Sequence, residues 1–155
     1  PEKMTVTHNP FFKLKLIDLS DDTQVNSGGG INTQTLQPAA GFCYQIVKIF
    51  VDIPDPVGSA ANDHRLYVGN TTNLDNNAFF SIVSGTGTDI TINEYGLGGT
   101  TEVPANIAQQ QELIYFLLYC NHDNPIEFLY INNTDVNQTG TRTIKVLVKE
   151  YKEGV

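Results

Sequence analysis

Short runs of β-branched and aromatic residues, each bounded by Gly, Pro, Asn or Asp, recur along the whole chain. Runs of this kind are typical of strands joined by turns, and they predict about eight strands. The predicted strands span residues 11–19, 42–53, 64–68, 78–84, 89–93, 112–120, 126–132 and 142–151. The only helix that we expect is a short one at residues 104–111, where a proline precedes alanine and glutamine. The pattern therefore predicts an all-β fold.

The composition of the chain agrees with this fold class. Charged residues make up 17% of the chain, against about 25% in an average soluble protein. Asn and Thr take much of their place, and these residues favour turns and strands respectively. Strands of irregular spacing, with two long early connections at residues 20–41 and 54–63, favour a two-sheet antiparallel sandwich over an up-and-down barrel. We expect a sandwich of the jelly-roll or Greek-key type.

Two of the predicted strands indicate which side chains face the core. In residues 142–151, Ile144, Val146 and Val148 fall on one face and Thr143, Lys145 and Lys149 on the other, which is typical of a half-buried antiparallel strand. In residues 42–53, the apolar alternation changes phase after Ile46. A strand with a period of two accommodates this change only through a bulge or a switch between sheets.

The length of 155 residues fits one domain. No linker, repeat or charge block divides the chain, so we expect a single β-sandwich domain at residues 11–155. Residues 1–10, with proline at both ends, predict an extended N-terminal arm that could pair with the sheet edge of a neighbour. The candidate interface residues are Val6, His8, Phe11 and Phe12.

The chain lacks the motifs of common catalytic sites. Ser84 does not lie in a GxSxG sequence, and no glycine-rich loop has the spacing of a dinucleotide or phosphate site. The candidate general bases His8, His64 and His122 each lie at a predicted strand end or turn. The Asp and Asn clusters are ordinary turn formers and do not match the spacing of a calcium loop. We therefore expect a protein that is not an enzyme and that holds no metal or cofactor.

The two cysteines, Cys43 and Cys120, lie inside apolar runs and not in a metal-binding spacing. A pair of buried free thiols is one interpretation, because free cysteine behaves as a small apolar residue. A disulfide between two strands is the other, and it requires an oxidising compartment. The sequence leaves both interpretations open.

The chain is acidic, with a net charge of −8 and a pI of about 4.6. Binding to nucleic acid needs clustered Lys and Arg, and the chain offers only a modest basic density at Lys13 and Lys15 and from Arg142 to Lys149. The same scarcity disfavours an anionic membrane surface, and no apolar run reaches the ~20 residues of a spanning helix. We therefore expect neither nucleic acid nor a membrane as a partner.

A carbohydrate-binding module of the lectin type is the alternative function. Such modules bind sugars with exposed aromatic rings and Asn or Asp loops, and Tyr67 and Tyr95 are the candidate glycan contacts. The chain contains no Trp, which is the favoured surface for stacking. The same aromatic residues can also fill the core of a sandwich.

Several stretches together resemble a known class of proteins. Residues 125–134 and 139–148 form a closing pair of strands, and residues 42–54 precede a loop rich in Pro, Gly and Ala and a strand at 66–69. In architecture the chain resembles small β-sandwich virion structural proteins of tailed phages and similar viruses. The resemblance carries no signature motif, so it transfers no functional residue.

This resemblance implies a non-enzymatic capsid component, either a jelly-roll shell protein or a decoration, spike or fibre protein. It also implies homo-oligomers, with a trimer as one expected order, contacts with other capsid proteins, and a location in the virion after synthesis in the host cytoplasm. A shell protein that faces a genome often has a basic arm, whereas Lys3 is the only basic residue of residues 1–10 apart from His8. We therefore expect a role on the outer surface of the shell.

Overall fold

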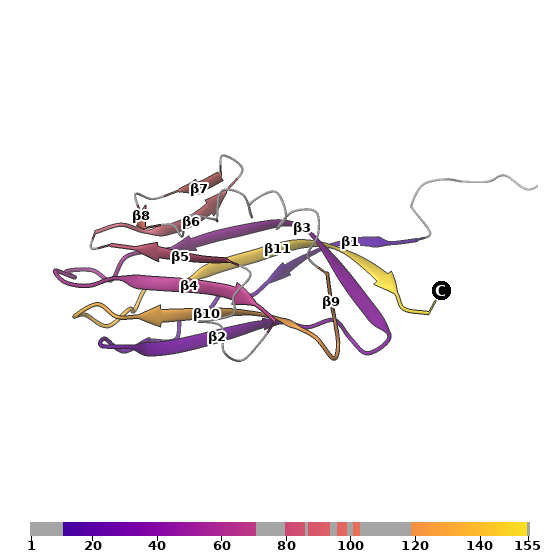
Figure 1. The fold of residues 1–155 in the computed structure, drawn as a ribbon, viewed down its shortest axis with the longest axis horizontal. Coiled ribbons are helices and arrows are strands. Elements are labelled where there is room, and N and C mark those ends of the chain that lie inside the picture. Colours follow the sequence, from indigo (N-terminus) through magenta and orange to yellow (C-terminus); the bar gives the residue numbers. More distant parts are fainter. Residues whose placement is uncertain are drawn as a thin grey trace, which may run out of the picture.

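The computed structural model describes residues 11–70, 80–85, 87–93, 96–98, 101–102 and 119–154, which form two antiparallel sheets (Figure 1). One sheet has the strand order β1 (Lys13–Asp18), β11 (Thr143–Lys152), β3 (Phe42–Ile53), β6 (Ile90–Asn93) and β7 (Gly96–Gly98), and β9 (Tyr119–Asn121) also pairs with β3. The other sheet has the order β2 (Gly30–Leu36), β10 (Ile126–Asn132), β4 (His64–Gly69), β5 (Phe80–Ser84) and β8 (Thr101–Glu102). The predicted all-β, two-sheet antiparallel sandwich is confirmed.

The order of the strands defines the type of sandwich. In one sheet the first strand, β1, lies beside the last, β11, which lies beside β3 and then β6. In the other sheet β2 lies beside β10, which lies beside β4 and then β5. In both sheets, strands from the two ends of the chain thus pair with each other, and the strand order is that of a jelly roll, which consists of two Greek keys.

Most predicted strands coincide with strands of the structure. The ranges 42–53 and 126–132 match β3 and β10, and β11 is displaced by one residue from the predicted 142–151. The long connection predicted for residues 20–41 is wrong, because it contains β2. The predicted arm at 1–10, the helix at 104–111 and most of the strand at 112–120 lie outside the described residues.

The phase change in β3 is a β-bulge, as one of the two predicted alternatives required. Leu147 pairs with Lys48 and Val148 pairs with Ile46, so Val47 has no partner residue of its own on β11. Alternate residues of β3 are buried on both sides of this extra residue. The bulge therefore keeps both halves of a twelve-residue strand against the same core.

The core lies between the two sheets and consists mainly of aliphatic side chains. The residues that contribute to it from the described strands are Leu36, Tyr44, Ile46, Ile49, Val51, Ile53, Leu66, Val68, Ile82, Ile90, Ile92, Cys120, Ile126, Phe128, Tyr130, Ile144, Val146 and Val148. Val25, from the segment between β1 and β2, joins them. Burial of this apolar surface is the main stabilising contribution to the fold.

Four connecting segments meet at one end of the sandwich, at the left of Figure 1. They are residues 19–29, 54–63, 85–89 and 133–142, which join β1 to β2, β3 to β4, β5 to β6 and β10 to β11. The strand registers require this arrangement, because Thr143 pairs with Asp52 in one sheet while Asn132 pairs with His64 in the other. We call these four segments the loop end.

Candidate functional site

The outer face of the sheet formed by β1, β11 and β3 carries three rows of paired side chains. Residues that alternate with the buried Val146 and Val148 point away from the core. The rows are Asp18, Lys145 and Phe50; Leu16, Leu147 and Lys48; and Leu14, Lys149 and Gln45. We call these nine residues the basic face.

Apolar groups on the basic face are open to solvent. Leu14 is 56% exposed and Leu16 is 58% exposed, although both lie in a regular strand. Leu147 and Phe50 are half-buried beside them. Lys48 lies over the ring of Phe50, with 5.2 Å between Nζ and the ring centroid. The basic face therefore combines exposed leucines with lysines that lie along them, which is a composition suited to a protein interface.

The charge of the basic face is opposite in sign to that of the whole chain. Lys48, Lys145 and Lys149 carry positive charge there, against the single carboxylate of Asp18. Hydrogen bonds from Ser20 lower the pKa of Asp18, which keeps that carboxylate ionised. Because the chain has a net charge of −8, its remaining surface is more acidic than the total indicates.

Two of the predicted interface residues lie at the margin of the basic face. Phe11 is 74% exposed. The ring of Phe12 lies 5.7 Å from that of Tyr151, and Nζ of Lys149 lies 4.7 Å from the centroid of Phe12. Val6 and His8, the other two predicted interface residues, lie outside the described residues. That these four residues form an interface stays a prediction.

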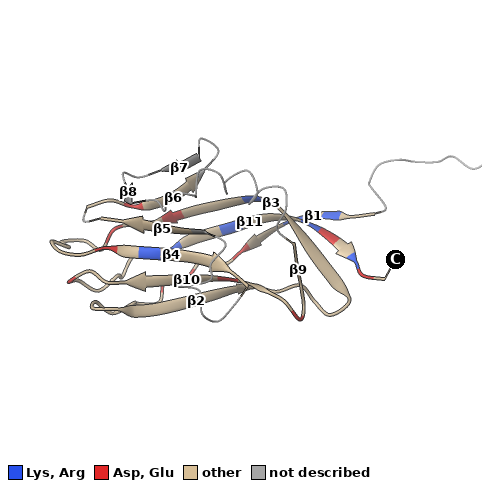
Figure 2. Ribbon diagram, viewed as in Figure 1, with Lys and Arg blue, Asp and Glu red and all other residues tan. Residues whose placement is uncertain are grey.

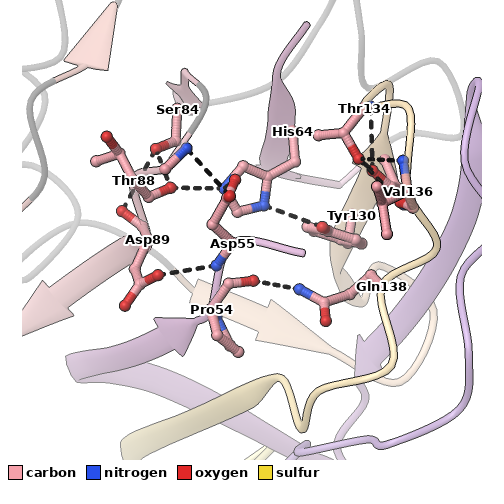
Figure 3. A network of polar contacts seen from close by, with 12 residues as sticks. Pro54, Asp55, His64, Ser84, Thr88, Asp89, Tyr130, Thr134, Val136 and Gln138 are labelled. Carbon is pink, nitrogen blue, oxygen red and sulfur yellow. Dashed lines mark hydrogen bonds and ion pairs between the residues drawn. The ribbon is translucent and has the colours of Figure 1, made fainter. Parts of the chain in front are cut away.

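Polar side chains are buried behind the loop end, on the side that faces the core. The members of this buried polar cluster, each at most 1% exposed, are His64, Ser84, Asn132, Thr134, Gln138 and Arg142. They come from β4, β5, the end of β10 and the segment 133–142. Figure 3 shows how several of them converge between the two sheets.

His64 is held by protein groups on both nitrogens of its ring. Nε2 lies 2.8 Å from the carbonyl oxygen of Thr88, and Nδ1 lies 2.9 Å from the hydroxyl of Tyr130. A carbonyl oxygen only accepts, so the neutral tautomer that satisfies both contacts carries its hydrogen on Nε2. Ser84 Oγ also donates to the Thr88 carbonyl, at 2.6 Å, and not to His64. The arrangement fixes the segment 85–89 and is not the pairing of a nucleophile with a base.

Carboxylates and amides tie the other segments of the loop end together. The backbone N–H of Asp55 donates to the carboxylate of Asp89 at 2.8 Å, and the carboxylate of Asp55 accepts from the N–H of Gly87 at 3.1 Å. Nε2 of Gln138 donates to the carbonyl of Pro54. These bonds, most of which Figure 3 shows, connect three of the four segments.

Asn132 terminates β10 and shapes the segment that follows it. Its Nδ2 donates to the carbonyl oxygens of Val25 and Val136 at 3.1 and 2.8 Å. Its Oδ1 accepts from the backbone N–H of Thr134 at 3.1 Å and from the Thr134 hydroxyl at 2.6 Å. All the capacity of the amide is used, so its burial leaves no polar group unsatisfied.

Arg142 is the buried cation of the cluster. Its Nη2 donates to the carbonyl of Thr23 at 2.7 Å and lies 3.5 Å from the carboxylate of Asp21. Its guanidinium lies 5.6 Å from the centroid of the Tyr130 ring. Burial raises the pKa of the Tyr130 hydroxyl well above its ordinary value, so this group stays protonated as a hydrogen-bond donor for His64.

Both cysteines are free thiols, but only Cys120 is buried and Cys43 is half-buried, so the prediction of a buried pair holds for Cys120 alone. Cys120 pairs with Tyr44 and points into the core, whereas the neighbouring Cys43 points to the outer face. Burial raises the pKa of Cys120 to about 12 and also raises the pKa of Cys43. Both groups therefore hold their protons near neutral pH, where a protonated thiol is a poor nucleophile.

The candidate glycan contacts receive no support from the described residues. Tyr67 lies on the outer face of the second sheet but is only 8% exposed, and its hydroxyl accepts from Nη1 of Arg65 at 3.4 Å. A sugar stacks on an open ring face, which Tyr67 does not offer. Tyr95 lies outside the described residues.

Across the described ranges, His, Cys, Asp and Glu side chains form no group of three that could hold a metal ion. The same ranges contain no helix with the length and apolar character needed to cross a membrane. Comparison with family models, curated proteins and solved structures found no match to this chain.

Sequence reasoning identified some parts of these two regions and missed others. His64 was considered as a general base, whereas its contacts are structural, and Phe12 was predicted as an interface residue, which stays a prediction. Asn132 was missed, although it continues the inward alternation of Phe128 and Tyr130 along the same strand. The basic face was missed because the strand register alone brings Lys48 beside the lysines of β11.

Proposed function

We propose that this chain is a non-enzymatic structural protein of a virion, acting by self-association and by contacts with other capsid proteins. The observation that carries the proposal is the jelly-roll strand order, which is shared by viral capsid domains. Fold alone does not determine function. The exposed leucines of the basic face add support, because a structural protein needs surfaces that neighbouring subunits can cover.

The contacts of His64 agree with a structural role for this buried histidine. Both of its ring nitrogens bond to groups of the protein itself. A side chain that acts on a substrate needs a nitrogen within reach of it. The hydrogen bonds of the buried polar cluster instead hold segments of the loop end in place.

Within the virion, we place the protein on the outer surface as a decoration, spike or fibre component. The net charge of −8 supports this choice, because an acidic protein is repelled by packaged nucleic acid. A jelly-roll shell protein is the other role that the fold suits. Homo-oligomers are expected in either role, with a trimer as one order.

The experiment is mass spectrometry of particles purified on a density gradient from cultures that express the chain. Peptides of this chain are expected to co-purify with the other capsid proteins, in a constant ratio across the particle peak. Treatment with nuclease, which removes nucleic acid outside the particles, is expected to leave that ratio unchanged. A chain found only in the soluble fractions would overturn the proposal.

A further inference from the structure

Charge is distributed unevenly between one sheet and one end of this molecule. The strands β1, β3 and β11 carry six lysines, Lys13, Lys15, Lys48, Lys145, Lys149 and Lys152, against three carboxylates, Asp18, Asp52 and Glu150. The four segments of the loop end contain no lysine and carry the aspartates Asp21, Asp22, Asp55, Asp63, Asp89 and Asp135. Their one arginine, Arg142, is 1% exposed. Figure 2 shows blue residues along this sheet, together with its fewer red ones, and red residues at the loop end.

The loop end also carries an apolar side chain in an unusual position. Val57, in the segment between β3 and β4, is 92% exposed. The aspartates Asp22, Asp89 and Asp135 are exposed at the same end of the sandwich. An apolar side chain among carboxylates is the chemical complement of leucines among lysines, and the basic face has that second composition.

We infer that a second copy of this chain docks its loop end, through Val57, on the basic face of the first. Val57 packs against the apolar strip of Leu14, Leu16 and Leu147, while the aspartates around it face the lysines. A contact between two basic faces would instead bring lysines against lysines, which is unfavourable. The complementary surfaces lie on different parts of the molecule, so the contact is heterologous.

This inference rests on the proposed function, because it names the partner and the surfaces through which the structural protein associates. A heterologous contact leaves one unused basic face and one unused loop end in every dimer. Repetition of the contact therefore gives rings where the rotation closes and open chains where it does not. Either outcome suits a component of a repeating shell.

The test uses two variants of the full chain, each with one surface altered. Leu16→Glu places a carboxylate on the basic face, and Val57→Glu places one at the loop end. Both side chains are exposed, so both variants are expected to unfold at the wild-type temperature. Each variant alone is expected to associate at least about tenfold more weakly than wild type, because a charge enters an apolar contact.

Mixing the two variants is the decisive step. The Leu16→Glu chain keeps an intact loop end, and the Val57→Glu chain keeps an intact basic face. An equimolar mixture is therefore expected to recover association, as dimers that contain one chain of each kind and do not grow further. Sedimentation velocity measures the species, and Ile31→Glu, at a side chain 65% exposed on the other sheet, is the matched control.

The outcomes distinguish this inference from the proposed function. A wild-type chain that associates while both variants also associate fully overturns the inference and leaves a self-associating protein. Variants that lose association without recovery on mixing overturn the heterologous contact. A wild-type chain that stays monomeric overturns the inference, and particle composition then decides the proposed function separately.

Discussion

At the scale of single residues, the hydrogen bond between Tyr130 and His64 allows these two polar side chains to be buried behind the loop end. Tyr130 is 1% exposed and His64 is fully buried, so Nδ1 of His64 depends on the Tyr130 hydroxyl for its hydrogen bond. An unsatisfied polar group in such a place costs more than a hydrogen bond contributes when it is made. The pair therefore constrains the segment 85–89 through the carbonyl of Thr88.

Tyr130→Phe tests this dependence. The change removes the hydroxyl and leaves Nδ1 of His64 without its partner, so the free energy of unfolding is expected to fall by about 1–3 kcal/mol. Chemical denaturation, followed by tyrosine fluorescence or circular dichroism, measures the change in the free energy of unfolding. Tyr151→Phe is the control, because its hydroxyl contacts Gln45 at 3.2 Å in a half-buried position and its loss is expected to cost less. Equal effects of the two variants would contradict the account.

The same residues show where sequence reasoning reaches its limit at this scale. The type of residue at position 64 identifies a group that can act as a base, but the sequence does not show what its nitrogens contact. Thr88 and Tyr130 are 24 and 66 residues away along the chain. Only the fold brings them to opposite sides of one imidazole.

At the scale of elements, β2 explains why part of the fold was not predicted. Its inward residues Asn32 and Gln34 are polar, whereas an inward strand face is ordinarily apolar. Both amides donate to Oδ2 of Asp21, at 3.0 and 2.9 Å. Hydrogen bonds to the carboxylate of Asp21 thus hold β2 against the segment that precedes it. Apolar residues do not occur at every second position of β2, so the sequence pattern did not predict this strand.

Asp21→Asn tests this attachment through its dependence on pH. Hydrogen bonds from Thr23 hold the pKa of Asp21 below its ordinary value in the folded protein. Asp21 therefore stabilises the fold above about pH 4, its unfolded pKa, and this stability is lost as the pH falls through the folded pKa. The free energy of unfolding of the variant is expected to be about 1–2 kcal/mol lower than that of wild type near neutral pH. It is also expected to depend less on pH in the acid range.

Urea denaturation at a series of pH values measures both effects. Asp22→Asn is the control, because Asp22 is the exposed neighbour of Asp21 and is expected to keep the unfolding free energy of wild type. An Asp21→Asn chain with both the unfolding free energy and the full acid dependence of wild type would show that this carboxylate does not stabilise the fold.

Other elements were predictable because their apolar patterns are strong. In β10 and β11, buried and less buried residues alternate along almost the whole strand. The sequence shows this alternation in β11 except at Leu147, whereas β10 was predictable from its run of aliphatic and aromatic residues. The bulge in β3 was also visible, as a change of phase at Val47. The strands β7 and β8, of three and two residues, are too short to show a period.

At the scale of the whole molecule, the basic face and the loop end arise from pairing between distant parts of the chain. The alternation of Lys145, Leu147 and Lys149 is visible in the sequence, but Leu14, Leu16 and Lys48 join it only through the strand register. The jelly-roll order collects four loops at one end of the sandwich. We propose that copies of the chain associate by docking the loop end of one on the basic face of the next.

Sedimentation velocity of the full wild-type chain, over a range of micromolar concentrations, tests this claim most directly. The account predicts a sedimentation coefficient that rises with protein concentration. It also predicts that added salt lowers the association, because salt screens the attraction between lysines and aspartates. A single monomeric species at every concentration, at low as well as high salt, would contradict it.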